Sequence, residues 1–276
     1  MKNWFATHSA EEDKLYASRP KKHKSNALSP CDMTPDDVDY EMAQGKHATA
    51  LEICGMNQES LEYFVEKYGE AYERLSFFKC QLISDLSPLS RLKNLKSVSI
   101  YWNIRAEALW DMSENTALEA IAVMDAKKLT KNGLPLLETG KTLKMVGING
   151  SIFEKYPFPG LSVFQNLTAL EELRLYDLKF ADKSLDALKT LPNLQTFDFD
   201  AGMFTTEEIA YMCARYPQIE GTFMGPYGPQ YPGSESYMRI SGYRKPTLEI
   251  PAQQKALDKH IAHFHALIEK YKKEEL

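Results

Sequence analysis

Residues 92–103, Leu-Lys-Asn-Leu-Lys-Ser-Val-Ser-Ile-Tyr-Trp-Asn, contain the pattern that decides the fold. Leu95 is followed three positions later by Val98, and two positions after that by Ile100. The same spacing recurs at Tyr72/Leu75/Phe77, Leu118/Ile121/Val123, Leu143/Val146/Ile148, Leu170/Leu173/Leu175 and Leu194/Phe197/Phe199, with weaker sets at Ala48/Leu51/Ile53 and Ile219/Thr222/Met224. Successive sets begin 24, 23, 23, 25, 27, 24 and 25 positions apart. A near-constant period of this length is typical of a solenoid of stacked repeats.

Two segments between these sets, Ser-Asp-Leu-Ser-Pro-Leu-Ser-Arg-Leu-Lys-Asn-Leu (84–95) and Leu-Lys-Thr-Leu-Pro-Asn-Leu (188–194), resemble the short bacterial, internalin-like class of the leucine-rich-repeat superfamily. The resemblance covers roughly residues 46–226 and implies an α/β solenoid with a parallel concave sheet. It also implies a module that binds other macromolecules and is not an enzyme, by analogy at the level of the fold.

One feature departs from the family pattern. The usual Asn or Cys, three residues past the last apolar strand residue, is met only at Cys80 and Asn103. The other units have Met56, Ala126, Ser151, Leu178 and Gly202 there. We therefore expect an irregular turn after most strands.

The chain divides into four expected parts. Residues 1–33 form a flexible or partly helical arm, 34–47 an N-terminal cap helix, 48–226 about eight repeats, and 227–276 a Gly/Pro-rich loop with a C-terminal cap helix. Caps are expected because the raw ends of a solenoid expose apolar surface.

Local signals support these caps. Ser9–Glu12 has capping-box spacing and predicts a short helix through Tyr16. Thr34, Pro35 and two aspartates predict the start of the N-terminal cap helix, with Gly45 as its stop and Val38, Tyr40 and Met42 packing on the first strand. Pro251 predicts the start of a helix to about Lys273, whose apolar stripe is Leu257, Ile261, Phe264, Ile268 and Tyr271.

The segments between strands are read in the same way. Helical returns are expected at 59–68, 105–113, 182–191 and 206–216, and a bulging loop at 156–160, where two prolines occur. Residues 225–233 are too rich in Gly and Pro for a helix or central strand. Residues 237–243 are expected to form a last strand, or a hairpin with 247–250.

Composition excludes several classes of function. The net charge of -5 over 276 residues gives no reason to expect a nucleic-acid partner, and no apolar run is long enough to span a membrane. The N-terminus lacks the apolar core of a signal peptide, and the four cysteines contain no CxxC pair. We expect a cytoplasmic, monomeric, bacterial protein with reduced thiols, no cofactor and no metal.

Side chains between the core positions are expected to face out along the concave sheet, where equivalent residues form ladders. One zone is an apolar ridge of Phe78, Tyr101 and Met124 beside a trough of Ser76, Ser99, Ala122 and Gly147. Trp102 lies at its rim, Asn149 continues the ladder, and Trp110 is assigned to the core. A second zone holds Glu172, Arg174, Tyr176, Asp198 and Asp200, with Arg174 and Asp198 expected to form a solvated ion pair.

The predicted function is therefore an intracellular protein-binding module. Its candidate partner-binding residues are Phe78, Tyr101, Trp102, Met124, Asn149, Arg174, Tyr176, Asp198 and Asp200. The plainer alternative is that the aromatic side chains pack on one another. A rival class is an enzyme, or an enzyme's accessory domain, with a site in the segment 221–246 near His260. His260 and His263 share a helix, but no HExxH, GxSxG, Walker-type or GxGxxG motif accompanies them.

Overall fold

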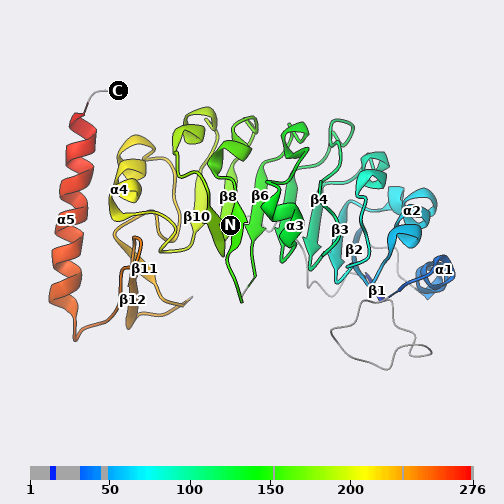
Figure 1. The fold of residues 1–276 in the computed structure, drawn as a ribbon, viewed down its shortest axis with the longest axis horizontal. Coiled ribbons are helices and arrows are strands. Elements are labelled where there is room, and N and C mark those ends of the chain that lie inside the picture. The colour runs from blue at the N-terminus through cyan, green and yellow to red at the C-terminus, as the bar shows by residue number, and fades with distance from the viewer. Residues whose placement is uncertain (1–12, 17–31, 45–48, 152, 232, 275–276) are drawn as a thin grey trace. The chain divides into compact units, whose positions relative to one another are not determined.

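The computed structural model describes residues 13–16, 32–44, 49–151, 153–231 and 233–274 (Figure 1). The chain divides into two compact units. Unit 1 comprises Met1–Leu170 and Lys179–Asn193, and unit 2 comprises Glu171–Leu178 and Leu194–Leu276. Cys31 and Gly45 lie outside the described residues.

The sheet of unit 1 is parallel. Its strands, in spatial order, are β1 (Asp13–Tyr16), β2 (Ala50–Cys54), β3 (Arg74–Phe78), β4 (Ser97–Tyr101), β5 (Ala120–Met124) and β6 (Met145–Asn149). Val98 lies opposite Ile121, and Ile121 opposite Val146, so the apolar sets stack as consecutive rungs. All three side chains are buried. The predicted stacking of repeats is confirmed within this unit.

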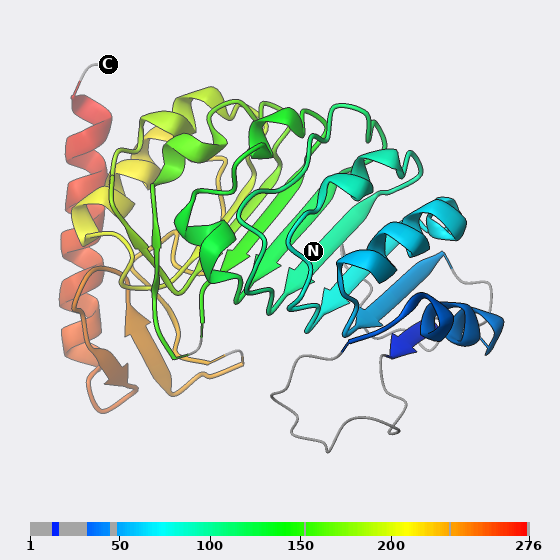
Figure 2. The same cartoon turned by 45° about the vertical axis from the view of Figure 1, so that its right-hand side comes forward.

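The return segments of unit 1 lie along one side of its strands (Figure 2). They include helices α2 (Gln58–Lys67) and α3 (Lys127–Lys131) and the 3-10 turns Gly69–Ala71, Ser87–Arg91, Leu137–Thr139, Leu161–Phe164 and Asp186–Thr190. The helix predicted at 59–68 is confirmed, with an Asn57–Ser60 capping box.

Two predicted return helices are wrong. Residues 105–113 are irregular, because Asn103 Oδ1 accepts from the backbone N–H groups of Arg105 and Ala106, and Leu109 N–H donates to Pro135. These three donors therefore bond outside any helical pattern. Residues 182–191 form only the 3-10 turn Asp186–Thr190, since the Asp182 carboxylate holds Ser184 N–H in a local turn.

The predicted bulging loop at 156–160 is partly extended. Tyr156–Phe158 form strand β7, which pairs with β9 (Leu178–Phe180). Ala181 N–H donates to Phe158 O at 2.9 Å, and the rings of Phe158 and Phe180 lie 5.7 Å apart. Gly160 has φ +144° beside the backbone of Asp182, where a Cβ atom would collide.

The N-terminal cap helix α1 (Pro35–Gln44) begins as predicted, with Thr34 Oγ1 accepting from Asp37 N–H. Val38 is buried, whereas Tyr40 is 45% exposed. The helix predicted through Tyr16 is wrong over its described part, because Asp13–Tyr16 form β1 and pair with β2. Residues 9–12 lie outside the described residues.

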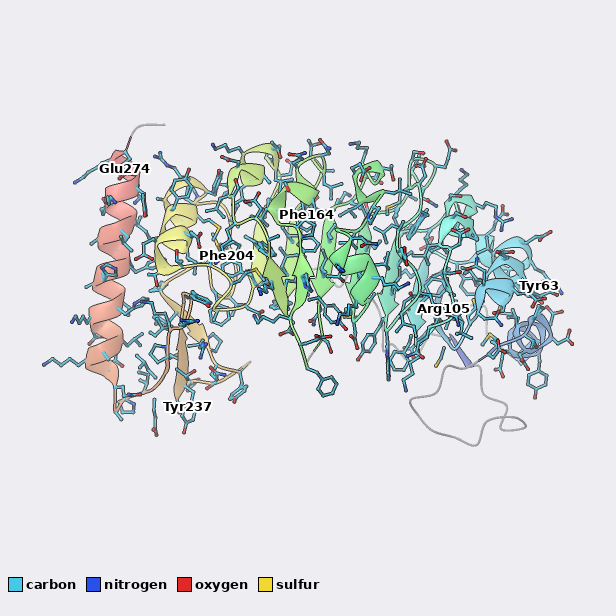
Figure 3. All side chains as sticks on the ribbon, in the orientation of Figure 1. Tyr63, Arg105, Phe164, Phe204, Tyr237 and Glu274 are labelled. Atoms are coloured by element: carbon cyan, nitrogen blue, oxygen red, sulfur yellow. The ribbon has the colours of Figure 1, made fainter. Side chains whose placement is uncertain are left out.

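Asp39 joins α1 to α2. Lys67 Nζ lies 2.9 and 2.8 Å from its two carboxylate oxygens, and the Tyr63 (Figure 3) and Tyr68 hydroxyls each donate at 2.7 Å. Bonding to Lys67, then Tyr68 and Tyr63, lowers the pKa of Asp39 to about 2. The cap is therefore held by a charged network as well as by Val38.

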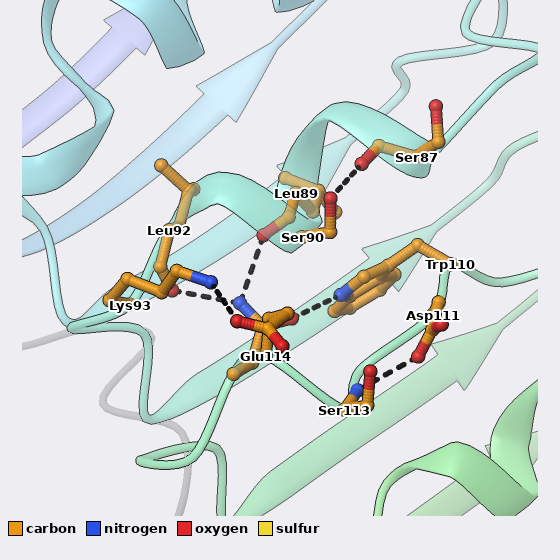
Figure 4. Close-up of polar contacts among 10 residues, drawn as sticks. Ser87, Leu89, Ser90, Leu92, Lys93, Trp110, Asp111, Ser113 and Glu114 are labelled. Atoms are coloured by element: carbon orange, nitrogen blue, oxygen red, sulfur yellow. Dashed lines mark hydrogen bonds and ion pairs between the residues drawn. The ribbon is translucent and has the colours of Figure 1, made fainter.

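Two buried asparagines tie neighbouring repeats of unit 1 together. Asn103 Nδ2 donates to the Cys80 and Ile83 carbonyls, at 3.0 and 2.9 Å. Asn115 Nδ2 donates to Leu89 and Leu92 at 3.0 and 2.8 Å, while its Oδ1 accepts from the Trp110 indole at 2.8 Å (Figure 4). Trp110 is fully buried, as predicted, although no helix carries it.

Unit 2 contains the parallel strands β8 (Glu172–Tyr176) and β10 (Thr196–Phe199), with Leu173 opposite Phe197. The last, degraded repeat contributes only a single parallel bridge, between Thr196 and Glu220. Helix α4 (Thr206–Arg215) follows β10 and is capped by Thr205. Phe204 (Figure 3) packs edge-on against Phe199, with 5.0 Å between centroids.

The C-terminal part of unit 2 is a small antiparallel sheet followed by a long helix. The sheet has the order β11 (Tyr227–Pro229), β12 (Tyr237–Ile240) and β13 (Thr247–Glu249), so β11 is an edge strand and the predicted hairpin is confirmed. Helix α5 spans Gln254–Lys273. Leu257 packs on the sheet, and Tyr271 meets Tyr211 of α4 at 5.6 Å, so the helix caps this unit as predicted.

We predict that Asn115→Ala lowers the free energy of unfolding by about 2–4 kcal/mol, because it leaves two carbonyls and the Trp110 indole without partners in the core. Urea unfolding followed by circular dichroism measures the change. The matched control is Asn94→Ala, which removes one exposed bond, to Glu70 O, and should cost under about 1 kcal/mol. Equal losses for the two variants would contradict a bridging role for Asn115.

The Asp39 network predicts a pH dependence. The folded pKa of Asp39, about 2, lies below its ordinary value of 3.8, so its stabilising contribution is present above about pH 4 and disappears as the pH falls toward 2. Asp39→Asn should therefore melt at a lower temperature than the wild type at pH 6. The difference should shrink between pH 4 and pH 2; a gap that stayed constant would rule out the network as its source.

Candidate binding surface

The predicted ridge forms on the outer face of the unit 1 sheet, the face turned away from the stacked apolar sets. Phe78 lies opposite Tyr101, and Tyr101 opposite Met124. The Phe78 and Tyr101 rings are 5.1 Å apart and tilted by 39°. Tyr101 is 38% exposed, and Phe78 and Met124 are partly exposed. The aromatic rings pack on one another, yet they still present apolar surface to solvent.

A row of turn residues borders the ridge. Lys79, Trp102 and Asp125 directly follow β3, β4 and β5, and all three have left-handed backbone, with φ of 53, 60 and 49°. Lys79 Nζ lies 5.2 Å from the Phe78 ring and 5.1 Å from the Trp102 ring. A cation between two aromatic faces is attracted to both rings. Lys79 thus joins Trp102 to the ridge.

The trough beside the ridge is not an open groove. Its members align as expected, with Ser76 opposite Ser99 and Ala122 opposite Gly147. However, Ser99 and Ala122 are only 3% and 7% exposed, and Ala120 in the neighbouring ladder is fully buried. These small residues therefore leave little accessible surface between the strands. Accessible apolar surface is concentrated on the ridge itself.

Asn149 continues the ridge ladder, opposite Met124. Its backbone carbonyl accepts from Asp125 N–H at 3.0 Å. Its Oδ1 atom is buried and accepts no hydrogen bond from the described residues. This register places Asn149 at the end of the ridge, and its side chain adds a polar group to an otherwise apolar ladder.

The second predicted zone lies in unit 2 and is organised differently from the prediction. Arg174 forms its ion pair with Glu172, on its own strand, where a pair with Asp198 was expected. Asp198 is 6% exposed and accepts from Thr222 N–H at 2.8 Å. Asp198 therefore stabilises the turn at 221–224, in the last repeat.

The two other members of this zone are also engaged. Asp200 accepts from Asp177 N–H at 2.9 Å, and so holds the turn after β8. Burial, with a further contribution from Asp198, raises the pKa of Tyr176 to about 12. Any role of Arg174, Tyr176, Asp198 or Asp200 in partner binding stays a prediction.

The sequence pattern does not predict the row of left-handed turn residues that follow the strands. A left-handed residue follows the strand at Gly55, Lys79, Trp102, Asp125 and Asp177. Only the glycine signals that conformation, since Lys and Trp rarely adopt it. The next residues, Met56, Cys80, Asn103, Ala126 and Leu178, are all buried. The turn is thus the same at these five strands, and the expected irregularity is wrong at Met56, Ala126 and Leu178. After β6 and β10, the units with Ser151 and Gly202, no left-handed residue follows the strand.

These recurring turns complete a repeat with one strand, one sharp turn and one return in register with the next. The fold is that of a leucine-rich-repeat solenoid. This assignment depends on the period of the apolar sets and on the residue-by-residue pairing of β2 to β6.

No family model and no curated protein sequence matches this chain. Among solved structures, it is similar to internalin InlF of Listeria monocytogenes, with 17% identity over 54% of this chain and 47% of that one and a TM-score of 0.33. Internalin InlC2 of the same organism matches with 16% identity over 60% and 76% of the two chains, at a TM-score of 0.29. A chain of the Drosophila Toll–Spatzle complex matches with 16% identity over 57% and 24%, at a TM-score of 0.40. This chain thus spans less than half of InlF and of the Toll complex chain.

The rival enzyme site near His260 gains no support from geometry. Burial lowers the pKa of His260, which sits on α5 with its ring 6.4 Å from Phe264. Within the described residues, no three His, Cys, Asp or Glu side chains converge where a metal ion could bind. None of the described helices is long and apolar enough to cross a membrane.

Accessibility on the outer face can be tested with single cysteines. In a background with Cys31→Ser and Cys54→Ser, Tyr101→Cys should react with a maleimide at least about 10-fold faster than Ala122→Cys, because thiol reactivity follows exposure. Cys213 contributes little, since burial raises the pKa of its thiol to about 11. Mass spectrometry over a time course gives the rates, and similar rates at positions 101 and 122 would show that the trough is open.

Proposed function

We propose that this chain is an intracellular, cytoplasmic protein-binding module, and that unit 1 holds its partner on the ridge of Phe78, Tyr101 and Met124, with Trp102 at the rim. The observation that carries the proposal is the contact between the Phe78 and Tyr101 rings at 5.1 Å, with Tyr101 38% exposed. Contiguous aromatic surface left in water does not stabilise a folded protein. Contiguous exposed apolar surface marks interaction sites.

The chemistry of the ridge fits a protein partner. Aromatic residues and Met are enriched at the centres of protein interfaces, where rigid rings lose little conformational entropy on binding. Lys79 stacks on Phe78 and Trp102 and restrains both rings. The surface is therefore largely pre-organised, which lowers the free-energy cost of binding.

Two further features support the proposed compartment and the proposed binding surface. The cysteines at 54, 80 and 213 form no disulfide among the described residues, as is usual in a reducing compartment. The ridge is built on regular strands rather than on loops, which positions its side chains by the register of the sheet. The proposal assigns no reaction to the chain, and its binding surface needs neither cofactor nor metal.

The test is capture of partners from a lysate of the source cells, followed by affinity measurement with the purified partner. Tyr101→Ala combined with Met124→Ala should weaken that affinity at least about 10-fold, because truncating central aromatic anchors costs more than about 1.4 kcal/mol. The matched control is Tyr40→Ala with Leu136→Ala, which removes exposed residues away from the ridge. Unchanged capture by the ridge variant would refute the site.

A further inference from the structure

Phe153 is the most exposed large apolar residue among the described residues, at 89%. It lies in the short connection between β6 and β7, where Ser151 and Glu154 exchange backbone hydrogen bonds of 3.2 and 3.3 Å. Phe153 N–H also donates to Ser151 Oγ at 3.4 Å. Local bonds, rather than side-chain packing, thus hold the phenyl ring out in water.

The base of this connection is firmly anchored. Tyr156 is buried and donates its hydroxyl hydrogen to the Asp125 carboxylate. Lys127 Nζ lies 2.6 Å from the Glu154 carboxylate and 5.6 Å from the Tyr156 ring. Asp125 N–H in turn donates to Asn149 and Gly150, at the end of β6. The connection that carries Phe153 is therefore anchored to β6 and to the residues that follow β5.

Phe153 shares an edge of unit 1 with the rim of the ridge. Because β4, β5 and β6 are parallel and adjacent, the segments that follow them lie along one edge of the sheet. Trp102 and Ile104 follow β4, Ile104 being 48% exposed, and Phe153 follows β6. Three accessible apolar side chains thus line the edge next to Tyr101.

We propose that Phe153 is a protruding anchor that inserts into an apolar pocket of the protein partner held by the ridge. This inference rests on the proposed function and adds the partner's chemistry: a folded protein with a pocket of phenyl size. Aromatic anchors that fill pockets carry much of the energy of such interfaces. The pocket lies on the partner, because the exposed group on this chain is a projection.

The charges around the loop favour a protein over a lipid surface. Lys127 is paired with Glu154, and Lys128 with Glu107, each at 2.6 Å. Anionic membranes are recognised by clusters of basic residues that lack such carboxylate partners. A lone phenyl ring beside neutralised pairs matches an apolar protein pocket better.

The experiment places the photo-crosslinking residue p-benzoylphenylalanine at position 153 of the full chain, and at position 40 as the exposed control. After irradiation in a lysate of the source cells, the residue at 153 should join one protein, at residues lining an apolar pocket. Cross-linking no stronger than from position 40 would overturn the proposal.

Affinity for the cross-linked protein gives the second readout. Phe153→Ala should weaken binding by about 10- to 100-fold, because that loss of affinity corresponds to the free energy of burying a phenyl side chain. Phe153→Leu, which keeps an apolar side chain, should retain most of the affinity. A change under about 2-fold for Phe153→Ala, or Phe153-dependent sedimentation with vesicles of phosphatidylcholine and phosphatidylserine, would overturn the anchor.

The two proposals can fail separately. If Phe153→Ala weakens binding while the double variant of Tyr101 and Met124 binds normally, the ridge assignment fails and the anchor stands. If only the double variant loses affinity, the ridge stands and the anchor fails.

Discussion

The parallel register between neighbouring strands is the constraint on which the rest of unit 1 depends. Each strand residue lies opposite its equivalent in the next repeat, so Val98, Ile121 and Val146 form one buried rung. A slip of one residue would turn every buried side chain to the outer face. The same register aligns Phe78 with Tyr101 and Tyr101 with Met124. Core and ridge are therefore set by a single hydrogen-bond pattern.

The left-handed turn after β2, β3, β4 and β5 keeps this register from one repeat to the next. A left-handed backbone at a residue other than glycine costs about 1 kcal/mol or more. In return, Lys79 N–H reaches the Tyr101 carbonyl and Trp102 N–H reaches Met124, which extends the ladder past the strand ends. Buried Asn103 then holds the backbone of the preceding return. Local strain is offset by bonds to the neighbouring repeat, so the turn persists without glycine.

Polar residues on this chain illustrate a competition between binding and folding. Asp198 and Asp200 occupy ladder positions that suggested recognition, yet each accepts a backbone N–H of a turn. A buried carboxylate is stable only with such donors. Within the described part of the chain, the apolar ridge and Phe153 have no comparable partners that bury them, which is why we assign binding to apolar groups.

The sequence by itself determined the class of the fold, the stacking of the apolar sets and both caps, because these follow from side-chain period and capping residues that act over a few positions. Only the tertiary structure decided the rest. It made the return at 105–113 irregular, since Asn103 and Pro135 take its backbone partners. It closed the trough, paired Arg174 with Glu172, and exposed Phe153. These outcomes depend on which side chains and backbone groups meet in the folded chain, and the spacing of apolar residues along the sequence does not encode that.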